Sequence, residues 1–256
     1  MSEPILGIDI GGSGIKGAVV DVHQGTFIGD RFRLPTPQPA APEPVGQAVA
    51  ALVRHFAWQG PIGCAFPAII KAGVAYTAAN VDPTWIGTDI QALFAMQTGC
   101  PITVLNDADA AGLAELAFGA ARGHPGVVLL LTFGTGIGSA LLADGRLVPN
   151  TELGHLLIGG HTAEALASDR VRKLQRLSWK RWARRLDALF KYLERLFAPD
   201  LFIVGGGVSK DHAQFLPLLT VRTPIVPAVL QNRAGIVGAA LAVGSAPAEP
   251  QKLISR

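Results

Sequence analysis

Two glycine-rich turns in the chain have the composition of phosphate-binding loops. The first is Asp9-Ile-Gly-Gly-Ser-Gly-Ile-Lys16 and the second is Thr132-Phe-Gly-Thr-Gly-Ile-Gly138. Glycine lets backbone N–H groups approach phosphate oxygens without interference from a Cβ atom. Neither turn is a Walker loop, because no Gly-Lys-Ser/Thr follows, and neither is a Rossmann turn, because a strand and not a helix follows. Each alone is equally compatible with a tight hairpin, but the pair indicates a clamp on a phosphate chain.

Two aspartates carry side-chain chemistry suited to phosphoryl transfer. Asp9 lies at the first turn, where a carboxylate beside phosphates holds Mg²⁺ chiefly through water, although a turn-capping role is the alternative. Asp107 follows a predicted strand, at the sheet edge where α/β enzymes place their chemistry. Because phosphoryl transfer recurrently uses an Asp that accepts the hydroxyl proton, we expect Asp107 to be the base. Asp109 is expected to be a carboxylate favoured by the N-terminus of the next helix.

Several short polar side chains could bind the hydroxyl groups of a sugar. They are Asn80, Asn106, Glu152, His155 and Glu164. Each of them alone is equally an ordinary polar residue, and a lone histidine is more often structural than a ligand.

The glycine turns lie in two similar units, each a strand, a turn and a returning strand. The first unit covers residues 5–22 and the second covers residues 127–143. A repeat of this kind indicates an internal duplication, and therefore two lobes of α/β type. We expect a first lobe over residues 1–108 and a second over residues 109–234, with a last helix at about 235–245 packed back on the first lobe.

Other elements follow from apolar periodicity. Strands are predicted over residues 62–66, 102–105 and 201–204, and helices over residues 45–58, 90–98, 108–119 and 234–243. The proline-rich residues 34–44 predict a loop, because proline fixes φ and removes a hydrogen-bond donor.

A basic stripe lies between Arg170 and Arg195, where ten Lys and Arg residues face only Asp187 and Glu194. Leucines recur there at helical spacing, with Ser178 as a candidate cap of the second of two helices; they are Leu174, Leu177, Leu186, Leu189, Leu193 and Leu196. One interpretation is a solvated amphipathic face. The other is a groove for a long polyanion, formed by Lys173, Arg176, Lys180 and Arg184.

Composition limits the class of protein. The 256 residues carry a formal net charge of +3, and 49% of them are apolar, but no apolar run approaches the roughly 20 residues that span a bilayer. The N-terminus lacks the features of a signal peptide, so we expect a cytoplasmic protein without a membrane partner. Cys64 and Cys100 are too few for a disulfide framework and are expected to be small buried apolar residues.

Four strings in the chain resemble the ROK family of bacterial sugar kinases and repressors over nearly its whole length. They are Asp9-Ile-Gly-Gly-Ser-Gly-Ile-Lys16, Leu105-Asn-Asp-Ala-Asp-Ala-Ala-Gly112, Phe133-Gly-Thr-Gly-Ile-Gly-Ser139 and Glu152-Leu-Gly-His155. Further strings resemble the polyphosphate-using glucokinases of that family, among them Pro199-Asp-Leu-Phe-Ile-Val-Gly-Gly-Gly-Val-Ser-Lys210 and Asn232-Arg-Ala-Gly-Ile-Val-Gly-Ala-Ala240.

The resemblance implies two ribonuclease H-like lobes of the actin-like ATPase superfamily, and a homodimer. It implies that Asp107 is the base toward the 6-hydroxyl of glucose, that the five polar residues named above hold other hydroxyls, and that Mg²⁺ accompanies polyphosphate or ATP as donor. The residues that it assigns to the phosphate donor are Asp9, Gly11, Gly12, Ser13, Gly14, Lys16, Thr132, Gly134, Thr135, Gly136, Gly205, Gly206 and Gly207.

One departure from the family pattern concerns zinc. Many ROK proteins follow Glu-x-Gly-His with a cysteine-rich zinc motif that ends in a glutamate, but residues 156–163 contain no cysteine. We therefore expect no zinc, with Glu164 as the retained glutamate.

Three alternatives stay open. An ATP-dependent ROK hexokinase acting on glucose, mannose or fructose would use the same Asp107. A sugar-responsive repressor needs a helix-turn-helix ahead of Asp9, where only eight residues stand, so no nucleic-acid partner is expected. A non-catalytic polyphosphate-binding protein would leave the pair Asn106-Asp107 without a purpose.

Overall fold

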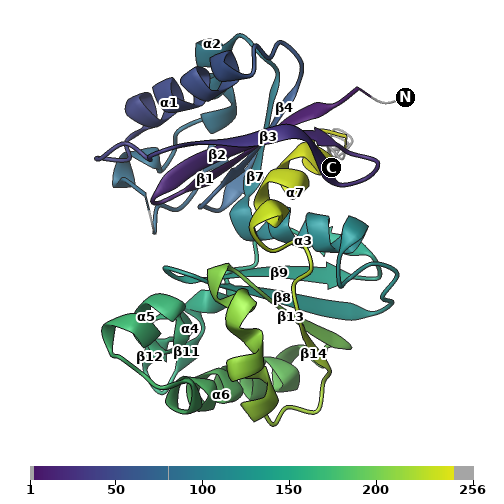
Figure 1. Cartoon of the computed structure of the whole chain (residues 1–256). Helices are drawn as coiled ribbons and strands as arrows, with labels where there is room; N and C mark the ends of the chain where they lie inside the picture. Colours follow the sequence, from purple (N-terminus) through teal and green to yellow (C-terminus); the bar gives the residue numbers. More distant parts are fainter. Residues whose placement is uncertain (1–2, 80, 245–256) are drawn as a thin grey trace, which may run out of the picture.

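The computed structural model describes residues 3–79 and 81–244, which form two stacked lobes with one five-stranded sheet each (Figure 1). The first sheet has the order β3-β2-β1-β4-β7. Its strands are β1 (Ile5–Gly11), β2 (Gly14–Asp21), β3 (Thr26–Leu34), β4 (Ile62–Phe66) and β7 (Ile102–Asn106). β1, β2 and β3 pair antiparallel, whereas β1, β4 and β7 pair parallel.

The second sheet repeats this topology in the order β10-β9-β8-β13-β14. Its strands are β8 (Val127–Phe133), β9 (Ile137–Ala143), β10 (Arg146–Val148), β13 (Leu201–Gly205) and β14 (Ile225–Pro227). Again a three-stranded antiparallel part is extended by parallel strands. The two strand–turn–strand units recognised in the sequence are therefore equivalent in the fold, and the predicted duplication is confirmed.

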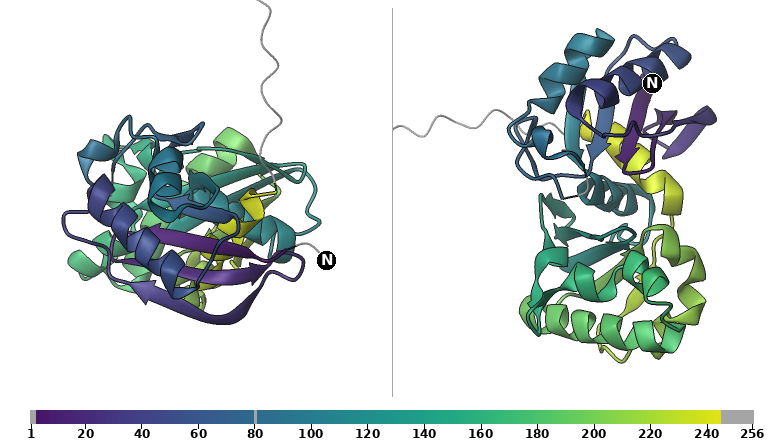
Figure 2. Two further views of the ribbon diagram at one scale, coloured as in Figure 1. Left: turned by 90° about the horizontal axis from the view of Figure 1, so that it is seen from above. Right: turned by 90° about the vertical axis from the view of Figure 1, so that its left-hand side faces the viewer.

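Two helices lie between the sheets, α3 (Asp107–Phe118) and α7 (Ala234–Ala242), as the views in Figures 1 and 2 show. α7 is made almost entirely of small and β-branched residues, so its backbone approaches its neighbours closely. A Cβ atom at Gly238 would collide with the backbone of Ala110 in α3, and one at Gly63 in β4 would collide with the backbone of Ala239. The predicted boundary at residues 108/109 falls within α3, so we propose that the lobes divide along this helical layer.

The outer face of the first sheet is covered by α1 (Pro42–His55) and α2 (Ile90–Thr98), and that of the second sheet by α4 (Ala163–Ala167) and α6 (Trp179–Phe197). The short helix α5 (Asp169–Leu174) follows α4 and packs against it. Short strand pairs form from β5 (Ile70–Lys71) with β6 (Val74–Ala75) and from β11 (Leu157–Ile158) with β12 (His161–Thr162). Short 3₁₀ helices occur at Pro83–Trp85, Leu153–His155, Gly207–Gln214, Leu216–Leu218 and Gln231–Arg233.

Several sequence predictions can be compared directly with these elements. Ser178 is the cap of α6, since its hydroxyl accepts the N–H of Arg181, as predicted. The predicted loop over residues 34–44 is too long, because α1 begins at Pro42 and proline is tolerated in a first helical turn, where the N–H has no helical partner. Leu174 and Leu196 were expected on an apolar face but are 72% and 53% exposed.

Both cysteines are buried and free, as predicted. Within residues 3–79 and 81–244, no helix has the length and apolar character needed to cross a membrane.

Candidate active site

The turn between β7 and α3 presents Asp107. The side chain of Asn106 caps α3, because its Oδ1 accepts the N–H groups of Ala108 at 2.8 Å and Asp109 at 3.1 Å. Its Nδ2 donates to the carbonyl of Ala68 at 3.0 Å. Asn106 was expected to bind a sugar hydroxyl, but the structure uses most of its hydrogen-bonding capacity to fix the turn. Its amide nitrogen carries a second N–H, for which no protein acceptor is seen among the described residues.

Asp107 stands at the first residue of α3, with its Oδ1 2.8 Å from the N–H of Ala108. Burial raises the pKa of Asp107 to about 7, the negative charge of Asp9 adds to this effect, and the N–H of Ala108 opposes it. A carboxylate with a pKa near neutrality is matched to general-base chemistry at physiological pH.

A polar cavity of about 260 Å³ opens on one side of Asp107. The sequence predictions for sugar contacts meet here, because Asn106, Asp107, Glu152, His155 and Glu164 all line it. Both glycine turns reach it as well, through Gly11, Gly12, Thr132, Gly134, Thr135 and Gly136. Asn80, the remaining predicted sugar contact, lies outside the described residues. We call this cavity the acceptor pocket.

Glu152, His155 and Glu164 form a cluster in the acceptor pocket. Nε2 of His155 lies 3.6 Å from Oε2 of Glu152, and its Nδ1 lies 4.0 Å from Oε1 of Glu164. Burial raises the pKa of Glu152, His155 lowers it and Glu164 raises it. Three groups that accept or donate hydrogen bonds therefore converge at one wall, which suits the ring hydroxyls of a sugar.

A second cavity of about 290 Å³ lies on the other side of Asp107. It is lined by predicted donor contacts, namely Asp9, Lys16, Thr132, Gly134, Gly205, Gly206 and Gly207. Asp9 and Lys16 are cross-strand neighbours, and Nζ of Lys16 lies 3.2 Å from Oδ2 of Asp9. We call this cavity the donor cavity. Asp107 and Gly134 line both the acceptor pocket and the donor cavity.

Two of the predicted donor contacts point elsewhere. The carbonyl of Ser13 accepts a hydrogen bond from Arg33 at 2.8 Å, and Gly14 is buried against the same guanidinium. Neither residue lines the donor cavity or the acceptor pocket. Gly14 belongs to β2, where its neighbour is the edge strand β3, and a donor contact of Ser13 and Gly14 stays a prediction from the family resemblance.

Glu115 is a residue of the donor cavity that sequence reasoning missed. It is fully buried, and its carboxylate accepts backbone N–H groups of Ala120 at 2.8 Å, Val229 at 3.1 Å and Leu230 at 2.7 Å. It thereby fixes the segment that carries Gln231 and Asn232 into the donor cavity. The sequence did contain one indication of this role, because Glu115 is an acidic residue among the apolar residues in the second half of α3.

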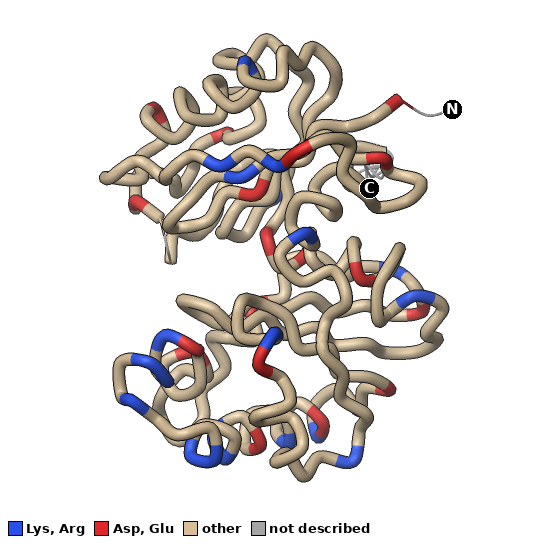
Figure 3. The backbone as a smooth tube through the Cα atoms, in the orientation of Figure 1, with Lys and Arg blue, Asp and Glu red and all other residues tan. Residues whose placement is uncertain are grey.

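A third, larger hollow of about 620 Å³ continues from Gly134, Thr135 and Gly207 along α5. Among its lining residues are the cationic side chains of Arg170, Arg172, Lys173 and Lys210. Lys and Arg gather over this part of the second lobe in Figure 3, where α5 can be located from Figure 1. The N–H of Arg170 donates to the carbonyl of Gly134 at 3.0 Å, which joins α5 to the second glycine turn. We call this hollow the cationic groove.

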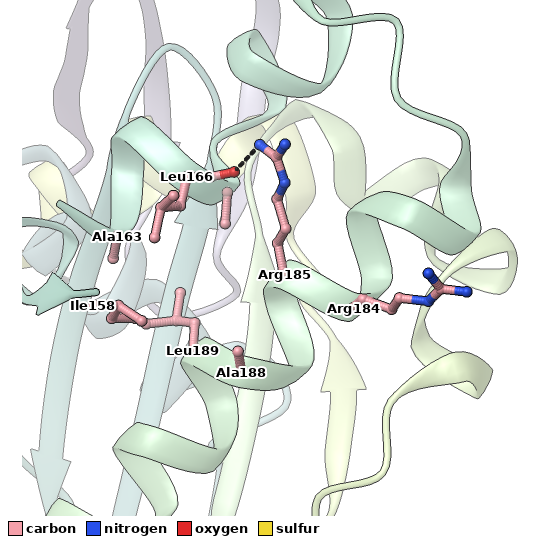
Figure 4. Close-up of a pocket in the computed structure, with 8 residues that line it drawn as sticks. Ile158, Ala163, Leu166, Arg184, Arg185, Ala188 and Leu189 are labelled. Carbon is pink, nitrogen blue, oxygen red and sulfur yellow. Dashed lines mark hydrogen bonds between the residues drawn. The ribbon is translucent and has the colours of Figure 1, made fainter. Parts of the chain in front are cut away.

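The structure separates the four residues predicted for a polyanion groove. Lys173 lines the cationic groove, with its Nζ 2.6 Å from Asp169. Arg176 and Lys180 are exposed and do not line it. Arg184 was expected there too, but it lies at a different, mostly apolar cavity of about 210 Å³ between α4 and α6 (Figure 4). Helical spacing correctly predicted that α6 has a basic face. It could not predict that this face does not line the groove beside the glycine turns.

Asp9 was predicted to hold Mg²⁺. Asp9 and Asp107 both line the donor cavity, and a cation there would be attracted by both carboxylates. Among residues 3–79 and 81–244, no group of three His, Cys, Asp or Glu side chains could hold a metal ion. Mg²⁺ commonly keeps several waters and is bound by one or two carboxylates together with substrate phosphates, so the residues present fit an ion that enters with the donor.

Two lobes of equal topology, each with a glycine turn that faces a shared site, define the actin-like ATPase fold of sugar kinases. The ROK family model matches residues 5–168, and the chain belongs to this family.

Relatives of known activity resemble the chain over nearly its full length. The polyphosphate glucokinase of Mycobacterium tuberculosis is 51% identical over 238 residues, which cover 93% of this chain and 90% of that protein. The crystal structure of an inorganic polyphosphate/ATP-glucomannokinase from Arthrobacter sp. strain KM is 53% identical, with a TM-score of 0.93 over 95% of this chain and 99% of that one. A ROK family glucokinase from Streptomyces griseus, in complex with glucose and AMPPNP, shares the fold at 24% identity, with a TM-score of 0.81 over 94% and 99% of the two chains.

Proposed function

We propose that the chain is a glucokinase that transfers the terminal phosphoryl group of inorganic polyphosphate, or of ATP, to the 6-hydroxyl of glucose. The observation that carries this proposal is the place of Asp107, which lines the acceptor pocket and the donor cavity together. The names of the two most similar relatives described above, a polyphosphate glucokinase and a polyphosphate/ATP-glucomannokinase, support the same reaction.

In the proposed reaction, Asp107 accepts the proton of the 6-hydroxyl while the sugar oxygen attacks the terminal phosphorus. The bond from that phosphorus to the bridging oxygen breaks, and the shortened polyphosphate or ADP leaves with the electron pair. Backbone N–H groups of the two glycine turns and the ammonium of Lys16 stabilise charge on the transferring group. Asp9 would hold Mg²⁺, which neutralises donor phosphates when it is bound.

Binding of glucose is assigned to the wall formed by Glu152, His155 and Glu164, together with the second amide N–H of Asn106. Asn80 is retained as a proposed contact on the strength of the family resemblance. Glucose and mannose differ only in the configuration of one hydroxyl group. The alternative is therefore an ATP- or polyphosphate-dependent kinase that accepts several hexoses.

We propose that a long polyphosphate leaves the donor cavity through the cationic groove. Arg170, Lys173 and Lys210 line a path that starts at the glycine residues shared with the donor cavity. A linear polyanion gains affinity from successive cations, whereas ATP places only three phosphates near the reacting centre. Arg176 and Lys180, on the exposed side, would contribute little.

A matched pair of double variants tests this path. Arg170→Gln with Lys210→Gln should raise the KM for polyphosphate by about tenfold or more, since each lost cation weakens a phosphate contact, and should change the KM for ATP by less than about twofold. The control, Arg176→Gln with Lys180→Gln, removes the same charge outside the groove and should change neither constant. Equal effects of the two double variants would exclude the groove.

The activity itself is tested by following glucose 6-phosphate formation with Mg²⁺, with polyphosphate of defined length and ATP in parallel. Faster turnover with polyphosphate supports the proposal, and turnover with ATP alone would leave a glucokinase without a polyphosphate path. No product with either donor would reject the proposed function. A cytoplasmic location and a homodimer are further proposals from the family resemblance, and light scattering coupled to gel filtration tests the dimer.

A further inference from the structure

Asn150 joins the two lobes beside the acceptor pocket. It lies between β10 and the 3₁₀ helix Leu153–His155, in the second lobe. Its Oδ1 accepts the N–H of Ile70 at 2.8 Å and its Nδ2 donates to the carbonyl of Ile70 at 2.9 Å. One side chain thus satisfies both backbone groups of a residue in β5 of the first lobe, as a neighbouring strand would.

Asp109 holds Asn150 in place. Oδ2 of Asp109 accepts the backbone N–H of Asn150 at 2.7 Å. Asp109 is only 2% exposed, and its Oδ1 has no hydrogen-bond partner in the described part of the chain. Burying a carboxyl group with one unpaired oxygen lowers the stability of the fold. In return, the other oxygen of Asp109 fixes the backbone of Asn150.

The segments joined in this way are the two walls of the acceptor pocket. Ile70 follows Pro67 and Ala68, which line the pocket from the first lobe. Asn150 precedes Glu152, which lines it from the second lobe, and the carbonyl of Thr151 between them accepts the hydroxyl of Ser139 at 2.6 Å. Asp109 is two residues after Asp107 on α3. One set of hydrogen bonds therefore joins both walls, and Asp109, which belongs to this set, lies two residues from the base.

We propose that Asp109 and Asn150 are positioning residues for the acceptor sugar, a role that rests on the proposed glucokinase function. They hold the wall with Glu152 and the wall with Ala68 at a fixed separation in front of Asp107, without contacting the sugar. Neither residue lines the donor cavity. Their loss should therefore weaken glucose binding and leave donor binding nearly unchanged.

Asn150→Gly is the sharpest test. Asn150 has a φ of 60°, a left-handed conformation that glycine adopts freely, so the substitution removes the carboxamide without straining the backbone. It also keeps the N–H that Asp109 binds. Loss of two partly buried hydrogen bonds should raise the Kd for glucose, measured by calorimetry, and the KM for glucose by about tenfold, with the donor KM within about twofold of the wild-type value.

Asp109 is tested by a pair of variants. Asp109→Asn keeps an oxygen that can accept the N–H of Asn150 and should retain glucose affinity within about threefold, whereas Asp109→Ala should lose it by about tenfold. Asp187→Ala is the matched control, because Asp187 on α6 also accepts a backbone N–H from a distant segment, that of Thr220 at 2.6 Å, but lines neither the acceptor pocket nor the donor cavity. It should reduce stability and leave both constants unchanged.

The outcomes separate the inference from the function on which it rests. Wild-type protein that neither binds nor phosphorylates glucose would reject the proposed function. Wild-type protein that binds glucose, together with a folded Asn150→Gly that binds it equally well, would reject the positioning role. A parallel rise of the glucose and donor KM values, or the same rise in Asp187→Ala, would show general loosening and would also reject it.

Discussion

Replacement of Asp107 by Asn should abolish most of the activity and at the same time stabilise the fold at pH 8. The pKa of Asp107 is raised from 3.8 to about 7, chiefly by burial and then by Asp9. Between these two values the folded protein binds more protons than the unfolded chain, so the stability of the wild type falls as pH rises through this window and levels off above pH 7. Because Asn does not ionise, the stability of the variant lacks this fall with rising pH.

The magnitude follows from the two pKa values. Ionising Asp107 in the folded state at pH 8 costs roughly 4 kcal/mol, and at pH 5 less than half of that, since one pKa unit corresponds to 1.36 kcal/mol. The pKa of about 7 already includes the N–H of Ala108, which favours the ionised form. The variant should therefore be more stable than the wild type by about 3–4 kcal/mol at pH 8, and this gain should fall to about 1–2 kcal/mol at pH 5.

Urea denaturation of both proteins at pH 5 and pH 8 measures this difference, and steady-state kinetics should show a loss of kcat of about 10²–10⁴-fold. Asp187→Asn is a control of opposite sign. Partial burial raises the pKa of Asp187, but the Lys191 ammonium and the hydrogen-bond donors of Thr220 outweigh burial, so the pKa is lowered overall. That variant should lose stability at pH 8. The reasoning fails if Asp107→Asn keeps near-normal turnover, or if its stability relative to the wild type does not change with pH.

The remaining predictions concern the pH profile, the donor site and the helical layer. For the wild type, kcat/KM for glucose should rise with pH up to about pH 7 and then level off. Asp9→Asn should move this break to lower pH because it removes a charge that raises the pKa of Asp107, and an unmoved break would contradict the coupling. Glu115→Gln should raise the KM for ATP more than that for glucose in initial-rate assays, because Val229 and Leu230, which precede Gln231, lose the anionic acceptor of their two N–H groups. Gly238→Ala should lower the free energy of unfolding by about 1–3 kcal/mol in urea, since a Cβ atom there meets the backbone of α3, whereas Gly123→Ala, with open space around it but a positive φ, should lose about 1 kcal/mol or less.

The features that sequence reasoning captured are those that depend on local patterns. The two glycine turns, the polar end of β7 and the basic face of α6 are each contained in a short segment, and the repeated strand–turn–strand pattern is matched by the equal topology of the two sheets. Features that depend on which chain segments meet were out of reach. Asn150 and Ile70 are 80 residues apart, and nothing in either segment specifies the other.

Exposure also limited what the pattern could predict. β3 pairs along the edge of the first sheet, and most of its side chains are exposed, so it lacks the apolar alternation that marks a half-buried strand. Ser13 and Gly14 have the composition of a phosphate loop, yet their neighbour is Arg33 of this unrecognised strand.

The position of α7 governs the order in which the chain can fold. Ile236, Val237 and Ala240 complete the packing between β1, β4 and α3, although more than a hundred residues of the second lobe are synthesised before they are. We therefore expect the first lobe to keep an apolar face uncovered during translation until α7 has been synthesised. A first lobe expressed without Ala234–Ala242 should expose the same face, so both lobes are expected to depend on the full chain for the complete site.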